Sequence, residues 1–178
     1  MRRVLECIPA SSHPMDVMKV GCAFLGTTRT TSGPSCEAAS REAIDEMIAC
    51  FGSILCYWHH WHHSGRRINT SGNPGDTIAQ HFLRLLHQKE PQPEHVRTVD
   101  VSLILYAEHG FAASTFACRV TTSTLSDVYS SITTAIGTLK GPLHGGANEG
   151  TVNNLRTKIS VLCNLFFLCS CHGINFEV

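Results

Sequence analysis

The stretch REAIDEMIACFGSILCYW, residues 41–58, decides the fold class of this chain. Its apolar residues recur at steps of three and four, which is the spacing of one face of an α-helix. They are Ile44, Met47, Ile48, Phe51, Ile54, Leu55 and Trp58. A Gly-Pro-Ser break at residues 33–35 precedes this pattern and offers a place for a helix cap. The pattern predicts one long amphipathic helix that begins near Glu37.

Three segments that follow carry the same helical period. The first is expected to begin at Asp76 as its N-cap and to end near Gln88. The second starts at about Val96 and stops around residue 109, and the third runs from a Ser126 cap to about residue 141. Strand-like alternation of apolar and polar residues is almost absent. The sequence therefore predicts an all-α fold.

Composition and charge exclude several classes of function. The chain has 178 residues, of which 43% are hydrophobic, enough to fill the core of a single domain. Its 14 basic and 14 acidic residues cancel, which leaves no electrostatic footprint for nucleic acid or an anionic membrane. No apolar stretch approaches the roughly 20 residues of a membrane helix, and the first residues lack the apolar region of a secretory signal. We expect a protein that is not secreted and that binds neither nucleic acid nor membrane.

Nine cysteines and eleven histidines stand out in the composition. The cysteines are odd in number and form no C-x-x-C pair, so we interpret most of them as small buried hydrophobic residues in a reducing compartment. The ordinary pKa of a histidine side chain lies close to neutral pH, so its charge can change there without a special environment. The histidines are therefore the first place to search for chemistry.

Two segments place a histidine beside glycine, in loops of the kind that present functional side chains. In YAEHGFAAST, residues 106–115, His109 stands where a helical pattern gives way to glycine. In KGPLHGGANE, residues 140–149, His144 stands in a glycine-rich turn between two helical patterns. Glycines there let backbone N–H groups approach a ligand, and a following helix N-terminus favours an anionic group. A purely structural turn is the alternative for both segments.

The run WHHWHH, residues 58–63, raises the question of a metal site. His59, His62 and His63 share one helix face, as metal ligands can. No acidic residue or cysteine stands at a matching spacing, so we expect no bound metal. The sequence also contains no G-x-S-x-G elbow, Walker A motif or G-x-G-x-x-G motif.

Beyond these local patterns, two long segments resemble a known family. YAEHGFAASTFACRV, residues 106–120, and STLSDVYSSITTAIGTLKGPLHGGANE, residues 123–149, resemble the citrate synthase family, specifically its 2-methylcitrate synthase branch. PASSHPMDVMKVGCAFLG, SILCYWHHWHHSGRRI and HFLRLLH are similar to the same branch, so the resemblance covers residues 1–149. One departure is that Ala112 stands where the family usually has asparagine.

The resemblance implies an acyltransferase that joins propionyl-CoA or acetyl-CoA to oxaloacetate, which gives 2-methylcitrate or citrate. The coenzyme A thioester is a substrate, and the family needs no metal or prosthetic group. Its fold is all-helical, with a large and a small domain that close over the substrates in a homodimer. Family members work in the mitochondrial matrix or in the cytoplasm.

The resemblance also implies roles for individual residues. His109 matches the histidine that hydrogen-bonds the thioester carbonyl as the acyl-CoA becomes an enol. His144 matches the histidine that polarises the ketone of oxaloacetate. His60 and His81 lie in blocks that line the oxaloacetate site in relatives. A segment that contacts coenzyme A matches Thr138, Leu139, Lys140, Gly141 and Pro142.

Residue 149 is expected to be a boundary between two parts of the chain. Residues 1–149 match part of the family's large domain, whereas residues 150–178 are unrelated to the family and lack caps and a consistent apolar face, so we expect them to pack poorly. The small domain, with the aspartate that removes the α-proton and the arginines that hold carboxylates, has no counterpart here. One hypothesis is therefore an acyltransferase present as a truncated chain. The alternative is an inactive helical remnant that at most associates with a partner subunit.

Overall fold

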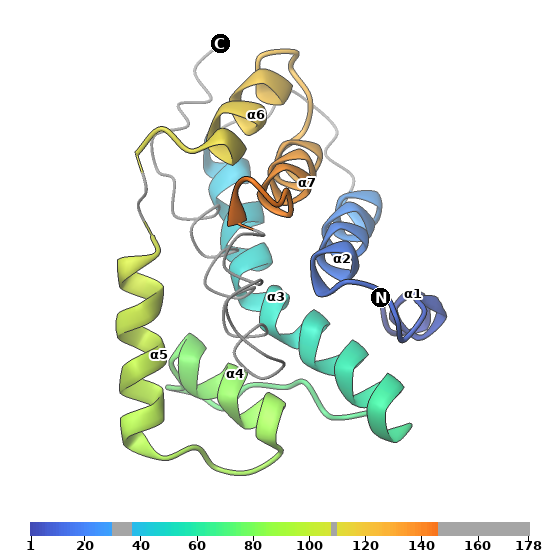
Figure 1. The fold of residues 1–178 in the computed structure, drawn as a ribbon, viewed down its shortest axis with the longest axis vertical. Helices are drawn as coiled ribbons and strands as arrows, with labels where there is room; N and C mark the ends of the chain where they lie inside the picture. The colour runs from blue at the N-terminus through green and yellow to red at the C-terminus, as the bar shows by residue number, and fades with distance from the viewer. Residues whose placement is uncertain (30–36, 108–109, 146–178) are drawn as a thin grey trace.

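The fold is all-helical, as the sequence predicts. A computed structural model describes residues 1–29, 37–107 and 110–145, and these form seven α-helices and no strand (Figure 1). The helices are α1 Arg2–Cys7, α2 Pro14–Thr28, α3 Glu37–Ser64, α4 Ile78–His87, α5 Pro93–Leu105, α6 Ala113–Thr122 and α7 Val128–Leu139. Two sequence predictions, the one for His109 and the one for residues 150–178, lie outside the described residues.

The long helix predicted from residues 41–58 is confirmed as α3, which continues past Trp58 to Ser64. It crosses the molecule and contacts α1, α2 and α7 on one side and α4 on the other (Figure 1). Phe51 and Leu55, two members of the apolar stripe, are almost completely buried. Because α3 contacts four other helices, its stripe organises most of the core.

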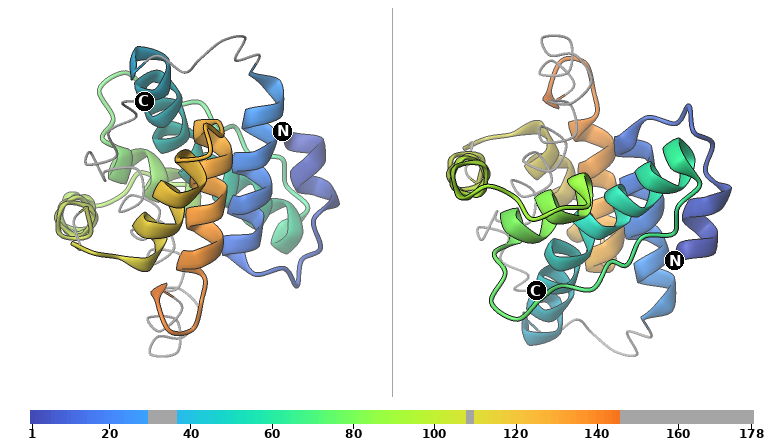
Figure 2. Two further views of the ribbon diagram at one scale, coloured as in Figure 1. Left: turned by 90° about the horizontal axis from the view of Figure 1, so that it is seen from above. Right: turned by 90° about the horizontal axis from the view of Figure 1, so that it is seen from below.

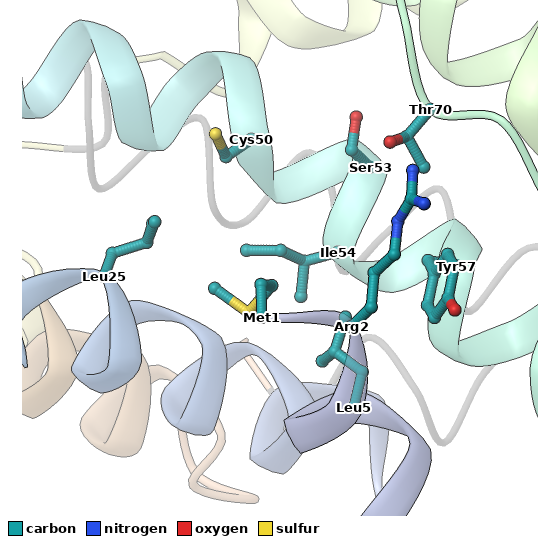
Figure 3. A pocket seen from close by; sticks show the side chains of 9 residues that line it. All are labelled: Met1, Arg2, Leu5, Leu25, Cys50, Ser53, Ile54, Tyr57 and Thr70. Atoms are coloured by element: carbon teal, nitrogen blue, oxygen red, sulfur yellow. The ribbon is translucent and has the colours of Figure 1, made fainter. Parts of the chain in front are cut away.

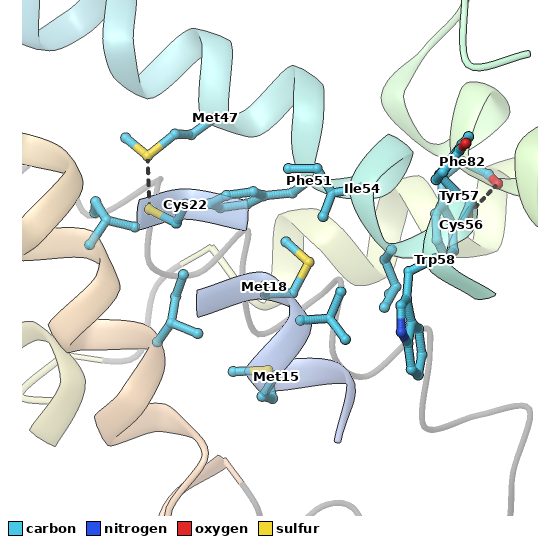
Figure 4. Close-up of a cluster of buried hydrophobic side chains, with 14 of the residues drawn as sticks. Met15, Met18, Cys22, Met47, Phe51, Ile54, Cys56, Tyr57, Trp58 and Phe82 are labelled. Carbon is cyan, nitrogen blue, oxygen red and sulfur yellow. Dashed lines mark hydrogen bonds between the residues drawn. The ribbon is translucent and has the colours of Figure 1, made fainter. Parts of the chain in front are cut away.

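The core lies where α2, α3 and α7 meet (Figure 4). Met18 and Cys22 of α2 are fully buried, and the Cys22 thiol lies 3.5 Å from the sulfur of Met47 on α3. Burial raises the pKa of Cys22 to about 11, so this thiol stays protonated and behaves as an apolar residue. Cys56 and Cys118 are buried as well, whereas Cys50 is half-buried and Cys7 is exposed, so three of the five described cysteines agree with the interpretation as core residues.

Two predicted helix caps are each wrong by one residue. Thr77, not Asp76, caps α4, because its hydroxyl accepts the Gln80 amide at 3.1 Å, while Asp76 pairs with Arg84. Asp127, not Ser126, caps α7, because its carboxylate accepts the Ser130 amide at 3.0 Å. In both places two neighbouring residues could cap, and the turn that precedes the helix decides between them.

Helices α6, α7, α2 and α1 follow one another across the molecule, while α5 stands at its edge (Figure 2). Helix α5 packs mainly on α4 and ends at Leu105, several residues before the end predicted near residue 109. Its last apolar side chains, Ile104 and Leu105, are 72% exposed. Within the described ranges, no helix combines the length and apolar character that crossing a bilayer requires.

Candidate functional site

The loop after α7 holds His144 against the start of α6. Helix α7 ends at Leu139, and the chain turns back through hydrogen bonds from the Gly141 amide to Thr138 O, at 3.0 Å, and from the His144 amide to Gly141 O, at 2.9 Å. A Cβ atom at Gly145 would lie 2.6 Å from the carbonyl oxygen of Leu139. Only glycine therefore fits directly after His144, which explains one glycine of the predicted glycine-rich turn.

The imidazole of His144 meets a buried serine of α6. Its Nε2 lies 2.9 Å from Oγ of Ser114, and the Ser114 backbone N–H donates to the same nitrogen at 3.4 Å. Ser114 is completely buried and is the second residue of α6. Ser114 and His144, from the described parts of the two histidine-bearing segments found in the sequence, thus contact each other in the fold.

The turn that leads into α6 differs from a well-capped helix start. Gly110 has a φ of +67°, a backbone conformation that favours glycine, and precedes Ala112, the N-cap residue. Ala112 provides no side-chain cap, whereas asparagine is among the best N-cap residues. The Ser114 amide of this first turn donates to His144 instead of to a capping side chain.

His60 and His81 both lie where α3 packs on α4. His60 Nε2 lies 2.9 Å from the carbonyl oxygen of Leu85 and 3.1 Å from that of Leu86, so it carries the proton and donates to the end of α4. His81 Nε2 lies 3.3 Å from Oγ of Ser53. Its Nδ1 is buried and has no hydrogen-bond partner among the described residues, and burial lowers the pKa of His81. Burial therefore favours the neutral form of His81.

The segment predicted to contact coenzyme A is the end of α7 and the turn beyond it. Leu139 is buried, Pro142 is exposed, and Thr138 donates its hydroxyl to Thr134 O at 3.0 Å. Lys140, which could meet a phosphate, instead donates to Asp16 of α2 at 2.6 Å.

Asp16 is therefore part of the surroundings of this segment, and no local sequence pattern points to it. Burial tends to raise the pKa of Asp16, but hydrogen bonds from Lys140 and Lys19 outweigh it and hold that pKa below its usual value. A phosphate that binds Lys140 has to compete with this carboxylate.

The histidine-rich end of α3 is used for packing. His62 Nε2 lies 3.4 Å from the carbonyl oxygen of Leu5 on α1, and His63 Nδ1 lies 2.9 Å from that of His59. The rings of His59 and His63 lie 4.1 Å apart. In the described part of the chain, no three histidine, cysteine or acidic side chains converge as metal ligands would.

A pocket of about 210 Å³ opens between α1, α2 and α3 (Figure 3). Its wall is mostly apolar and includes Leu5, Leu25 and Ile54, with Ser53 and Cys50 at one side. None of the site residues predicted from the sequence lines it. The pocket is thus separate from the contact between His144 and α6.

Comparisons with known proteins agree on one family. The family model described as "Citrate synthase, C-terminal domain" matches residues 1–160. The 2-methylcitrate synthase of Shewanella oneidensis is 51% identical over 152 residues, which cover 85% of this chain and 40% of that protein. The citrate synthase of Synechocystis is 38% identical over 157 residues and is covered to 38% of its length.

Solved structures give the same result. A ternary complex of citrate synthase from Thermoplasma acidophilum with carboxymethyl coenzyme A and oxaloacetate is similar to this chain, with a TM-score of 0.73 and 31% identity. The similarity covers 84% of this chain and 38% of that one. This chain therefore spans about 40% of the length of the curated relatives that it matches.

Proposed function

We infer, from the fact that this chain belongs to the citrate synthase family, that it takes part in the condensation of an acyl-CoA with oxaloacetate. The product is 2-methylcitrate when the acyl group is propionyl and citrate when it is acetyl. The observation that carries the proposal is His144, held in a glycine-rich loop against the N-terminal turn of α6. The 51% identity to a 2-methylcitrate synthase favours propionyl-CoA, although the two acyl groups differ by one methylene, worth only about 1–3 kcal/mol of discrimination.

The chemistry of the reaction matches what this site offers. A new carbon–carbon bond converts the ketone of oxaloacetate into an alkoxide, so a hydrogen-bond donor aimed at that oxygen lowers the barrier. We assign this donor to His144, whose ring is fixed by Ser114. His109 is proposed to stabilise the enol oxygen of the thioester, as the family resemblance implies. The two donors then serve two carbonyl groups that are about to react.

The resemblance also assigns substrate contacts to His81, His60 and residues 138–142. We propose that His81, whose buried Nδ1 has no hydrogen-bond partner in the described part of the chain, offers a contact for oxaloacetate. His60 already donates to two carbonyl groups of α4 and acts there by fixing the position of that helix. Residues 138–142 are proposed to contact coenzyme A, with the exposed Pro142 at the surface of that contact.

One catalytic group is not supplied by the matched residues. The resemblance assigns proton removal to an aspartate downstream of the His-Gly-Gly turn, and no aspartate follows Asp127 in this sequence. Loss of a general base typically costs about 10²–10⁴-fold in rate. We therefore propose that the 178 residues tested alone do not condense the substrates at a useful rate.

A subunit contact is also part of the proposal, because the resemblance implies a homodimer. Large apolar side chains are exposed near the junction of α5 and α6, among them Leu105, Phe111 and Phe116. Large apolar side chains left exposed are found on surfaces that another subunit covers. This observation also supports the alternative function, association with a partner without catalysis.

The proposal is tested best in a hybrid enzyme. The hybrid takes residues 1–149 from this chain and the remaining parts from the Shewanella oneidensis relative. Isothermal titration calorimetry then measures its affinity for oxaloacetate. His144→Ala should weaken binding by about 10- to 100-fold, since it removes a hydrogen bond to a charged ligand.

The matched control is His95→Ala, which removes an exposed histidine from α5 and should leave the affinity unchanged. If both variants bind oxaloacetate as the parent hybrid does, His144 does not contact the substrate.

A further inference from the structure

We propose that Ser114 is a positioning residue that fixes the proton of His144 on Nδ1, the ring nitrogen that Ser114 does not contact. The proposal rests on the function proposed above for His144. It concerns which ring nitrogen carries the proton, because a donor to a carbonyl oxygen must be the protonated nitrogen.

Ser114 places two hydrogen-bonding groups at one nitrogen of His144. Its backbone N–H donates to Nε2 at 3.4 Å, and its Oγ lies 2.9 Å from the same atom. A backbone N–H can only donate, so Nε2 has to accept. An imidazole whose Nε2 accepts carries its proton on Nδ1 when it is neutral. The serine hydroxyl then donates to Nε2 as well and further stabilises the Nδ1–H tautomer.

The local sequence makes both groups available. The Ser114 amide is one of the first N–H groups of α6, which have no partner within the helix. Ala112 has no side-chain oxygen to accept this amide. The N-terminal turn of α6 therefore directs the Ser114 N–H at the loop that contains His144.

The hydroxyl of Ser114 has a different hydrogen-bond partner from four threonine hydroxyls of α6 and α7. Thr121, Thr122, Thr134 and Thr138 all donate back to the carbonyl oxygen four residues earlier. At Ser114 that position is Gly110, which lies before the helix and whose carbonyl oxygen accepts the Ala112 amide. The Ser114 hydroxyl contacts His144 instead, across 30 residues of sequence.

Nitrogen NMR on the labelled 178-residue chain tests the proposal without any substrate. The ¹⁵N chemical shifts of an imidazole distinguish a protonated from an unprotonated ring nitrogen, and His144→Ala identifies the signals. At a pH where His144 is neutral, we expect Nδ1 to be protonated and Nε2 unprotonated. In Ser114→Ala the ratio of the Nδ1–H to the Nε2–H tautomer should fall about three- to tenfold, since one neutral hydrogen bond is lost.

Ser131→Ala is the matched control. Ser131 is also completely buried and hydrogen-bonded, but its hydroxyl contacts Asp127 O and Thr122 Oγ1. This variant should leave the His144 signals unchanged, and Ser114→Thr, which keeps the hydroxyl, should restore the tautomer.

Two results would overturn the proposal: a protonated Nε2 in the parent chain, or equal tautomer ratios in Ser114→Ala and the parent. The first needs no variant, so it holds even if Ser114→Ala does not fold. The measurement is also independent of the oxaloacetate titration. A failed titration beside the expected tautomer would count against the proposed function of His144 and not against the role of Ser114.

Discussion

At the scale of single residues, the site depends on contacts that join distant parts of the chain. The sequence predicted His144 from its glycine-rich turn, because glycines on both sides of a histidine are a local pattern. It did not predict Ser114 or Asp16 as partners, since the contacts from His144 to Ser114 and from Lys140 to Asp16 depend on how α6, α7 and α2 pack. Local spacing carries no information about such pairs.

Gly145→Ala tests how tightly the loop of His144 is fixed. The new Cβ would lie 2.6 Å from the backbone carbonyl oxygen of Leu139, so the loop has to move. We expect a loss of about 1–3 kcal/mol in the free energy of unfolding, measured by urea titration. The ¹⁵N signals of the His144 ring should change as well.

Gly137→Ala on α7 is the control for this loop variant. Its Cβ would meet only the Lys19 side chain at 3.7 Å, and alanine suits a helix interior better than glycine. This change should stabilise the protein by about 0.5–1 kcal/mol. If both variants gain stability, the loop does not pack on Leu139 as described.

At the scale of helices, the spacing of apolar residues predicted that a helix is present better than it predicted where the helix begins and ends. The stripe of α3 and the periods of α4 and α7 were sufficient to predict those helices. Helices α1 and α6 were not predicted, because they contain only 6 and 10 residues and lack a side-chain cap. The N-cap of α2 is His13, whose ring accepts the Met15 amide, and histidine is outside the usual set of N-cap residues.

Ala112→Asn should strengthen the start of α6. Asparagine at the N-cap accepts an amide of the first turn, which is worth about 1 kcal/mol in the free energy of unfolding. Ala113→Asn places the same side chain one residue inside the helix and should reduce stability by a few tenths of a kcal/mol, since alanine is the better helix former. Urea titration of both variants decides the matter, and equal stabilities would contradict the assignment of Ala112 as N-cap.

The position of α4 depends on an ion-pair cluster at its two ends. Arg84 donates to Asp76 before the helix and to Glu90 after it, at 3.0 and 2.9 Å. These hydrogen bonds hold the pKa of both carboxyl groups below their usual ranges. A carboxyl group whose pKa is lower in the folded state adds stability above its unfolded pKa and loses it as the pH falls.

Acid should therefore weaken this cluster. We expect the free energy of unfolding to fall as the pH is lowered from about 5 to about 3, near the ordinary carboxyl pKa. In Asp76→Asn the fall should be smaller, because that variant has no charge to lose at this position. Asp45→Asn, at an exposed position of α3, should keep the slope of the parent. Parallel pH profiles for the parent and Asp76→Asn would show that the pair has no role in stability.

At the scale of the whole molecule, the chain is an all-helical part of a citrate synthase-type fold. The sequence predicted the fold class and the family, because the segment from residue 106 to residue 149 is long and specific. The chain spans about 40% of the length of its curated relatives, so most of a complete enzyme of that length lies outside the match. We expect catalysis to depend on groups that this span does not supply.

The most direct test of the account is the release of coenzyme A thiol from propionyl-CoA and oxaloacetate. The hybrid with residues 1–149 of this chain should release thiol, and His144→Ala should reduce its rate by about 10²–10³-fold, as expected for a donor to a developing oxyanion. The 178-residue chain alone should stay at the background rate. Robust turnover by the chain alone, or a folded hybrid whose rate does not depend on His144, would contradict the account.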